Sequence, residues 1–207
     1  TAGETSRALD VLARMRRTRS PPPDTISYNA AISALGRGGE WPAALWLLDE
    51  AEAAADARPD VVTYTSAMVA LRAGGEWARA LQLLGRMRGA GVAPNEYSYS
   101  TAIAACEAGG QWVRGLSLLE EMGVAGHAPS VVAYSAAISA CGKGGAWLAA
   151  LKLLLRMPSK GLRPNAYSFN AAISACSRAS EWRAALLLLR RMRQEGGPHG
   201  AERPPST

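Results

Sequence analysis

The fold is decided by one stretch of sequence, residues 131–165, which read VVAYSAAISACGKGGAWLAALKLLLRMPSKGLRPN. Its first part places Tyr134, Ile138 and Cys141 at i, i+4 and i+7, the spacing of one face of a helix. The glycine pair at 144–145 is expected to end this helix, because glycine tolerates the left-handed backbone found at helix ends. The stretch therefore begins with a predicted amphipathic helix and a tight turn.

The rest of the stretch predicts a second helix, from Trp147 to about Met157. Pro164 closes the segment, and Asn165 is expected to cap the helix that follows. A helical hairpin of this kind cannot bury its apolar face alone, so we expect further copies to stack against it. The residues expected on the buried face of the second helix are Trp147, Leu151, Leu154 and Leu155.

The same pattern recurs along the chain, with one interval of 36 residues and later intervals of 35. Tryptophans mark it at Trp41, Trp77, Trp112, Trp147 and Trp182. Aromatic residues of the first helix keep the same spacing at Tyr28, Tyr64, Tyr99, Tyr134 and Phe169. Cysteines repeat at Cys106, Cys141 and Cys176. Several residue types in one register predict tandem repeats, with these residues packed between the helices.

The repeat limits follow from the residues before each aromatic. Residues 1–24 form a partial repeat with a second helix and a linker, and 196–207 is expected to be a flexible tail because it is rich in Gly and Pro. The predicted fold is all-α, with helix-turn-helix repeats stacked into a right-handed superhelical solenoid. The complete repeats, numbered one to five below, are 25–60, 61–95, 96–130, 131–165 and 166–195.

Composition narrows the range of functions. The chain is 48% hydrophobic with a net charge of +6, which fits a folded protein and permits an acidic polymer as partner. His127 and His199 stand apart from the cysteines, so no metal or other cofactor is expected. The sequence has no nucleophile–histidine–acid pattern and no phosphate-cradling glycine loop, which predicts that it is not an enzyme and has no small-molecule substrate. Its apolar runs are too short for a membrane span.

Several strings resemble the pentatricopeptide repeat, and together they cover about residues 6–195. Ile26-Ser27-Tyr28-Asn29-Ala30-Ala31-Ile32-Ser33-Ala34, Val62-Thr63-Tyr64-Thr65 and Tyr167-Ser168-Phe169-Asn170 look like its first helix. The run from Ala149 to Met157, followed by Gly161 to Asn165, looks like its second helix and closing motif. The related tetratricopeptide repeat has a period of about 34 residues. The resemblance implies binding of single-stranded RNA, one base per repeat, in a chloroplast or mitochondrion, for RNA processing, stability or translation.

The resemblance also implies which side chains select the bases. In this family they are the residue just after the aromatic and the last residue of the repeat. Short polar side chains suit this task because they can hydrogen-bond a base edge without filling its space. The implied preference is 5′-U-A-N-A-Y-3′, and the third repeat is expected to be the weakest reader. The base-recognition residues are Asn29, Asp60, Thr65, Asn95, Ser100, Ser130, Ser135, Asn165 and Asn170, the last with its partner position at Gly200.

Two further sets of contacts follow from the resemblance. The second residue of each repeat is implied to pack against a base face: Ile26, Val62, Tyr97, Val132 and Tyr167. Residues near the turn between the two helices are implied to contact phosphates: Arg37, Lys143 and Arg178, with Ala73 and Ala108 at the corresponding places of repeats two and three.

Other roles remain open for the same residues. Asp60, Asn95, Ser130 and Asn165 are each expected to cap the following helix, which does not exclude base contact. The alternative function is a protein-interaction scaffold of the tetratricopeptide type, which would hold a peptide in the same groove. Such a groove is expected to carry larger anchoring residues such as Arg, Lys and Asn, in place of the short polar side chains found after each aromatic. A third alternative is a degenerate repeat array that acts only as a spacer and binds no ligand. Such an array would be expected to lack these polar residues.

Overall fold

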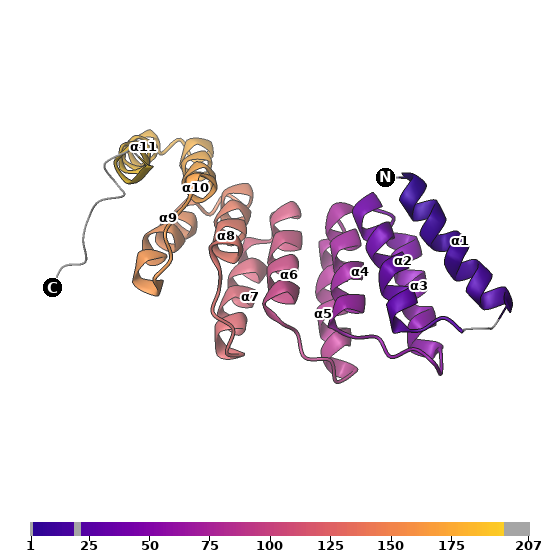
Figure 1. Cartoon of the computed structure of the whole chain (residues 1–207). Helices are drawn as coiled ribbons and strands as arrows, with labels where there is room; N and C mark the ends of the chain where they lie inside the picture. The colour runs from indigo at the N-terminus through magenta and orange to yellow at the C-terminus, as the bar shows by residue number, and fades with distance from the viewer. Residues whose placement is uncertain (1, 19–21, 197–207) are drawn as a thin grey trace. The chain divides into compact units, whose positions relative to one another are not determined.

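The computed structural model describes residues 2–18 and 22–196, and every regular element in this part of the chain is helical (Figure 1). The all-α, helix-turn-helix repeat fold predicted from the sequence is confirmed. The helices of the described part are α1 (Ala2–Thr18), α2 (Thr25–Gly38), α3 (Trp41–Ala53), α4 (Val61–Ala73), α5 (Trp77–Gly89), α6 (Glu96–Ala108), α7 (Trp112–Val124), α8 (Val131–Lys143), α9 (Trp147–Arg156), the short 3-10 helix η1 (Pro158–Lys160), α10 (Ala166–Arg178) and α11 (Trp182–Gly196).

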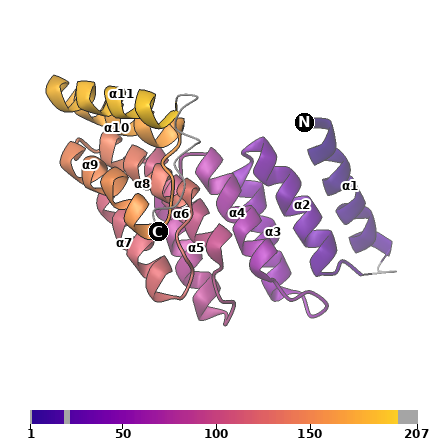
Figure 2. The same cartoon turned by 60° about the vertical axis from the view of Figure 1, so that its left-hand side comes forward.

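The helices form two compact units, Thr1–Gly109 and Gly110–Thr207. In the N-terminal unit, α2 packs on α4 and α4 packs on α6; these are the first helices of their repeats (Figures 1 and 2). The second helix α3 packs against both α2 and α4, and α5 packs against both α4 and α6. In the C-terminal unit, α8 packs on α10, and α9 packs on both. Each unit is therefore a stack of hairpins in which neighbours in sequence bury one another.

The first helix of each complete repeat begins at the first residue of the predicted repeat, and the residue before it is the N-cap. Asp60, Asn95 and Asn165 each accept a hydrogen bond of 2.9 Å from the backbone N–H three residues later. Ser130 accepts a longer one, of 3.4 Å, from Ala133. The predicted capping role is confirmed for all four residues, and each cap stabilises its helix by about 1 kcal/mol.

The aromatic residues and cysteines of the first helices form the core, as predicted. The aromatics are at most 3% exposed, and the cysteines are fully buried. The predicted buried face of the fourth repeat's second helix is wrong in one place. Leu155 is 50% exposed, whereas Leu153 is buried beside Leu154. The reason is that the buried face begins at Ala150 and continues at i+3, i+4 and i+7, which are Leu153, Leu154 and Met157. The helix itself ends at Arg156, since Pro158 has no N–H to continue it.

Tryptophan rings pack against the turn of the following repeat. A Cβ on Gly74 would lie 2.3 Å from Cδ1 of Trp41, and one on Gly109 would lie 2.3 Å from Cδ1 of Trp77. The same contact recurs between Gly144 and Trp112, at 2.2 Å. The expectation that tryptophans pack between helices is confirmed for these three. Trp182 differs, since it is 62% exposed.

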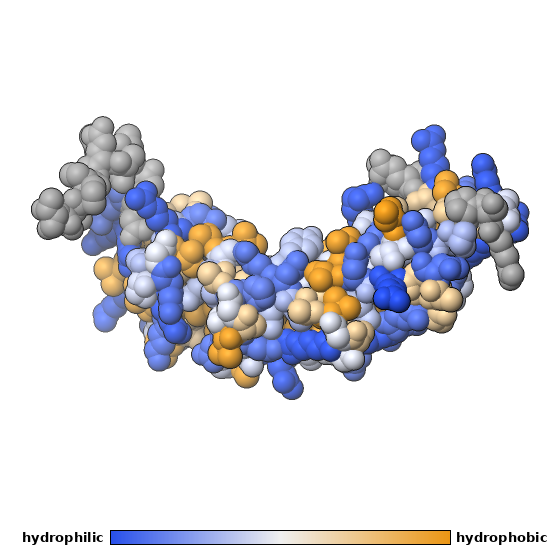
Figure 3. Space-filling view, turned by 60° about the horizontal axis from the view of Figure 1, so that its bottom comes forward, coloured by the Kyte–Doolittle hydropathy of each residue, from blue (hydrophilic) through white to orange (hydrophobic). Residues whose placement is uncertain are grey.

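The surface seen in Figure 3 shows hydrophobic residues in patches among hydrophilic ones. No helix in the described ranges is both long and apolar enough to span a membrane. The expected C-terminal tail falls outside the described residues from position 197 onward.

Candidate nucleic-acid interface

Each repeat exposes one apolar side chain at the same place, the second residue of its first helix. All five are exposed, by 51% to 75%, although the aromatic two residues later is buried in every repeat. A single exposed apolar residue needs no explanation, but one at the same position of every repeat marks a surface on which flat apolar groups can pack. These residues are Ile26, Val62, Tyr97, Val132 and Tyr167, the set for which the family resemblance implies base packing.

In the first repeat, the two side chains assigned to base selection touch. Asn29 donates from Nδ2 to Oδ1 of Asp60 at 3.1 Å. Thr63, the third residue of the capped helix, donates from its hydroxyl to Oδ1 of Asn29 at 2.6 Å. Burial raises the pKa of Asp60, but hydrogen bonds from Thr63 and Asn29 outweigh burial and leave this pKa below its usual value. The pair is therefore an amide held against a carboxylate that is charged at neutral pH.

In the second and fourth repeats, the residue after the aromatic is buried. Thr65 is 4% exposed, and its hydroxyl donates to the carbonyl oxygen of Val61 at 2.6 Å. Ser135 is 2% exposed, and its hydroxyl shares a 2.7 Å hydrogen bond with that of Ser168. Both hydroxyls are thus occupied within the protein.

The last residues of these two repeats present the accessible groups instead. Asn95 and Asn165 are exposed, and Oδ1 of each accepts from the backbone N–H that it caps. Within the described part of the chain, Nδ2 of each amide makes no hydrogen bond. Two donors on each side chain are therefore available to a ligand.

For the third and fifth repeats, the two base-selection residues are not described together in one unit. Ser100 is half-buried on α6 of the N-terminal unit, and Ser130 caps α8 of the C-terminal unit. Asn170 is exposed on α10, and its partner position, Gly200, lies outside the described residues.

A pocket of about 210 Å³ lies between α8 and α10 and gathers four of the predicted residues. Tyr167 and Asn170 enter it from the first turns of α10, while Lys143 and Arg178 enter from the last turns of α8 and α10. Arg178 also donates from Nη1 to the carbonyl oxygen of Gly142 at 3.4 Å. The pocket thus combines an aromatic ring, an amide and two cations, which suits a nucleotide with its phosphate.

Sequence reasoning missed two serines of this pocket, Ser139 and Ser174. A signal was present, because each stands four residues after a base-selection residue and four before a cation. The third predicted cation, Arg37, is exposed in the last turn of α2 in the N-terminal unit.

Two family models match the chain. The PPR repeat family model matches residues 59–108 and 129–178, and the PPR repeat model matches 26–53, 97–127 and 167–197. No curated protein matches the sequence.

Solved structures agree with the family models. The pentatricopeptide repeat protein PPR10 from maize is 30% identical with a TM-score of 0.74, over 94% of this chain and 28% of PPR10. PPR10 in complex with an 18-nt psaJ RNA element is 28% identical with a TM-score of 0.63, over 94% of this chain and 32% of that one. This chain therefore spans less than a third of PPR10.

The PPR domain of Arabidopsis thaliana protein-only RNase P 1, in complex with tRNA, shares the fold. It is 17% identical with a TM-score of 0.65, over 79% of this chain and 86% of that domain. The family models together match most of the sequence, and a structure 30% identical covers nearly all of it. The chain belongs to the pentatricopeptide repeat family.

Proposed function

We propose that this chain binds single-stranded RNA, one base per repeat, and that it does not itself catalyse a reaction. One observation carries the proposal: the apolar second residue is exposed in every repeat, beside the polar residue that closes the preceding repeat. The exposed apolar residues of two consecutive repeats can pack on the two faces of one base, while the polar residue hydrogen-bonds to the edge of that base. PPR10, at 28% identity, is solved with an RNA element, which supports the same ligand class here.

We propose different roles for the two base-selection residues of a repeat, and their burial and hydrogen bonds support this. In repeats two and four, the buried Thr65 and Ser135 leave space for a base, and the amides of Asn95 and Asn165 supply the donors that meet its edge. In repeat one, the Asn29–Asp60 pair offers an amide and a carboxylate together. The proposed preference is 5′-U-A-N-A-Y-3′, with N opposite the third repeat. Packing of a base against Tyr97 or Tyr167 contributes roughly 1–3 kcal/mol.

Family membership also leads us to propose a chloroplast or mitochondrial location, and a role in RNA processing, stability or translation. The RNA in question would contact more repeats than this chain contains, because a site of about five bases recurs often by chance.

The test separates base reading from helix capping by changing Asn165 to Ser. Serine caps a helix about as well as asparagine, and Ser130 already caps α8, so the variant should keep its stability. It removes the amide donors, so the preference for adenine at the fourth base should fall by on the order of tenfold. Binding of labelled RNAs that differ only at that base measures the preference, and urea denaturation measures the stability.

Matched DNA, duplex RNA and a scrambled RNA complete the experiment, at several salt concentrations. Equal and steeply salt-dependent binding to all of them would mean that the chain binds nucleic acids only through its positive charge and does not read bases. Absence of binding to every nucleic acid, with capture of a peptide in the groove, would favour the scaffold function instead. Asn165→Ala is the control that should lose both the cap and the donors.

A further inference from the structure

The third residue of a first helix is a fully buried hydroxyl residue in repeats two, three and five. These residues are Thr63, Ser98 and Ser168. Each hydroxyl accepts a hydrogen bond from the backbone N–H of the N-cap before it, at 2.9 Å for Thr63 and at 3.3 Å for the two serines. This bond completes a capping box, because the side chain of the N-cap accepts from the backbone of the same third residue.

In repeat two, this hydroxyl also reaches the base-selection pair of repeat one. Oγ1 of Thr63 lies 2.6 Å from Oδ1 of Asn29 and 2.9 Å from Oδ1 of Asp60. Helix capping requires only the contacts with Asp60, so the contact with Asn29 needs a separate explanation. Thr63 itself is not one of the residues implied to meet a base, and its burial keeps it away from any ligand.

The positions of the protons follow from these contacts. Nδ2 of Asn29 donates to Oδ1 of Asp60 at 3.1 Å, and a reversed amide would place two acceptor oxygens at that distance. The carboxylate therefore holds the amide nitrogen toward itself and turns the amide oxygen toward Thr63. Oγ1 of Thr63 accepts from the backbone of Asp60, and its single proton forms the shorter bond, the one to Asn29.

This network fixes what Asn29 can offer to a base. Its oxygen is bonded to a buried hydroxyl and one of its N–H groups to Asp60, so its second N–H is left for a ligand. Uracil and cytosine differ in the group on C4, which is an acceptor oxygen in uracil and a donor amino group in cytosine. An amide held as a donor can bond to the first group, whereas it faces the second donor to donor.

We infer that Thr63 is a positioning residue for the first base: its hydroxyl fixes the Asn29 amide as a donor and thereby favours uracil over cytosine. Thr63 acts through Asn29 and does not touch the RNA. This inference rests on the proposed RNA binding. It adds a buried residue of the next repeat to the two side chains through which the family resemblance explains base selection.

The same bridge recurs in the C-terminal unit. The hydroxyl of Ser168 shares a 2.7 Å hydrogen bond with that of Ser135 and lies 2.9 Å from Oδ1 of Asn165. These are the two base-selection residues of repeat four, so a third residue again contacts both members of the preceding pair. The arrangement is therefore not a peculiarity of the longer first repeat.

Ser98 supplies a matched control, because it has the capping box without the bridge. Its hydroxyl lies 3.0 Å from Oδ1 of Asn95, the N-cap. The residue after the aromatic in the preceding repeat is Thr65, whose hydroxyl donates within its own helix to the carbonyl oxygen of Val61. Ser98→Ala thus removes a buried capping hydroxyl and leaves the hydrogen bond of Thr65 in place.

The test compares RNAs that differ only in uracil or cytosine at the first base. The parent chain should bind the uracil RNA on the order of tenfold more tightly. Thr63→Val keeps the branched shape but removes the hydroxyl, so the Asn29 oxygen becomes free to accept from cytosine, and the ratio should fall to about twofold or less. Thr63→Ser should restore the ratio of the parent chain, and Ser98→Ala should leave it unchanged.

A double-variant cycle shows whether Thr63 acts through Asn29. In an Asn29→Ala background, Thr63→Val should not change the uracil-to-cytosine ratio further, because no amide is left to orient. Urea denaturation of every variant checks that the RNA is measured against folded protein. A similar loss of stability in Thr63→Val and Ser98→Ala is expected, since both lose the capping-box hydroxyl.

The outcomes separate this inference from the proposed function. If the parent chain binds no single-stranded RNA, both fail. The inference alone is overturned if the chain prefers adenine at the fourth base but binds uracil and cytosine equally at the first. It is also overturned if folded Thr63→Val keeps the ratio of the parent chain, or if Ser98→Ala lowers that ratio as much as Thr63→Val does.

Discussion

At the residue scale, the two glycines of the turn in repeat two serve different purposes. Gly75 has a φ of +75° with open space around it, so its backbone is what requires glycine. Gly74 has an ordinary φ of −81°, but the ring of Trp41 covers the place of its missing Cβ. The sequence interpretation attributed both glycines to the left-handed backbone, whereas the structure assigns the first of them to packing. Ser180 takes the second place in the fifth repeat, at a φ of +61°.

This division predicts opposite effects of two glycine-to-alanine changes. Gly74→Ala should lower the free energy of unfolding by about 1–3 kcal/mol, because its Cβ would overlap the rigid Trp41 ring. Gly85→Ala, within α5 and with nothing within 4 Å of the new Cβ, should raise it by about 0.5–1 kcal/mol. Urea denaturation followed by far-UV circular dichroism measures both. A loss of stability of equal size in the two variants would show that the Trp–Gly contact is not the cause.

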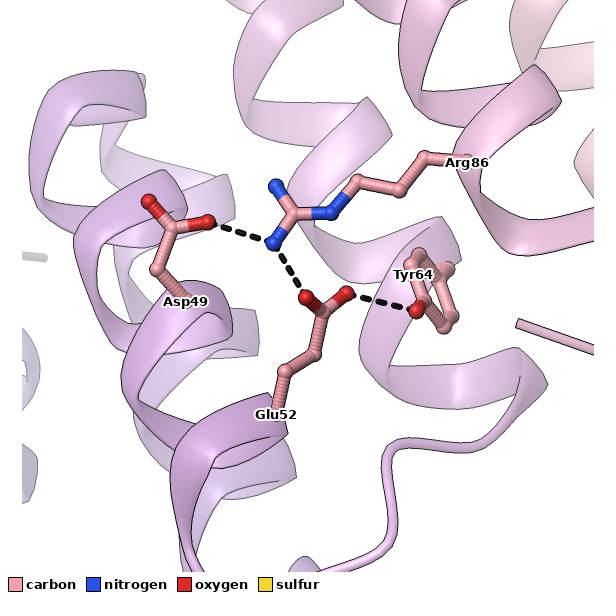
Figure 4. Close-up of polar contacts among 4 residues, drawn as sticks. All are labelled: Asp49, Glu52, Tyr64 and Arg86. Atoms are coloured by element: carbon pink, nitrogen blue, oxygen red, sulfur yellow. Dashed lines mark hydrogen bonds and ion pairs between the residues drawn. The ribbon is translucent and has the colours of Figure 1, made fainter. Parts of the chain in front are cut away.

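At the scale of elements, a polar cluster ties α3, α4 and α5 together (Figure 4). Arg86 donates to Oδ1 of Asp49 at 2.6 Å and pairs with Glu52, whose other oxygen accepts from the Tyr64 hydroxyl at 2.6 Å. Surface ion pairs alone add little, but here the carboxylate of Glu52 also satisfies a buried phenol. Burial, and then the Glu52 hydrogen bond, raise the pKa of Tyr64 to about 12.

This shifted pKa predicts a loss of stability in alkali. In the unfolded chain a tyrosine loses its proton near pH 10, whereas folded Tyr64 keeps its proton up to about pH 12. Between these values the unfolded state binds fewer protons, so the free energy of unfolding falls as the pH rises. Urea denaturation at intervals from pH 9 to 12 should show a shallower fall in Tyr64→Phe than in the parent chain. Identical slopes would mean that this phenol titrates alike in both states.

The elements also show how far the sequence could predict the structure. Helices, turns and caps were predictable because each depends on residues a few positions apart, as in the capping of α4 by Asp60. The ion pair between Glu52 and Arg86 was not, because it joins residues 34 positions apart whose adjacency depends on how hairpins stack. The burial of Ser135 was missed for the same reason, since its hydroxyl meets that of Ser168 in the next repeat. The base-selection positions came only from the family resemblance.

At the scale of the whole molecule, stability comes from packing between repeats that are neighbours in the sequence. Each helix packs only on near neighbours in sequence, so a helix with more neighbours gains more buried contact. Among the described helices, α4 packs against α2, α3, α5 and α6, whereas α1 packs against α2 and reaches α3 through Arg16, which pairs with Glu50 and lies over the Trp46 ring. In the other unit, α11 packs only against α10.

Hydrogen exchange of this 207-residue chain should follow that distribution. Backbone amides of α1 and α11 should exchange first, because opening either helix breaks less packing than opening α4 and leaves the other hairpins intact. Their apolar residues are already partly solvated, with Val11 55% and Leu187 64% exposed. Amides of α4 should exchange at least about tenfold more slowly, since opening α4 disrupts packing on four helices. Mass spectrometry of peptides from each helix measures the rates. Equal protection of α1 and α4 would mean that the N-terminal unit opens as one cooperative body, and the description by neighbouring repeats would then be wrong.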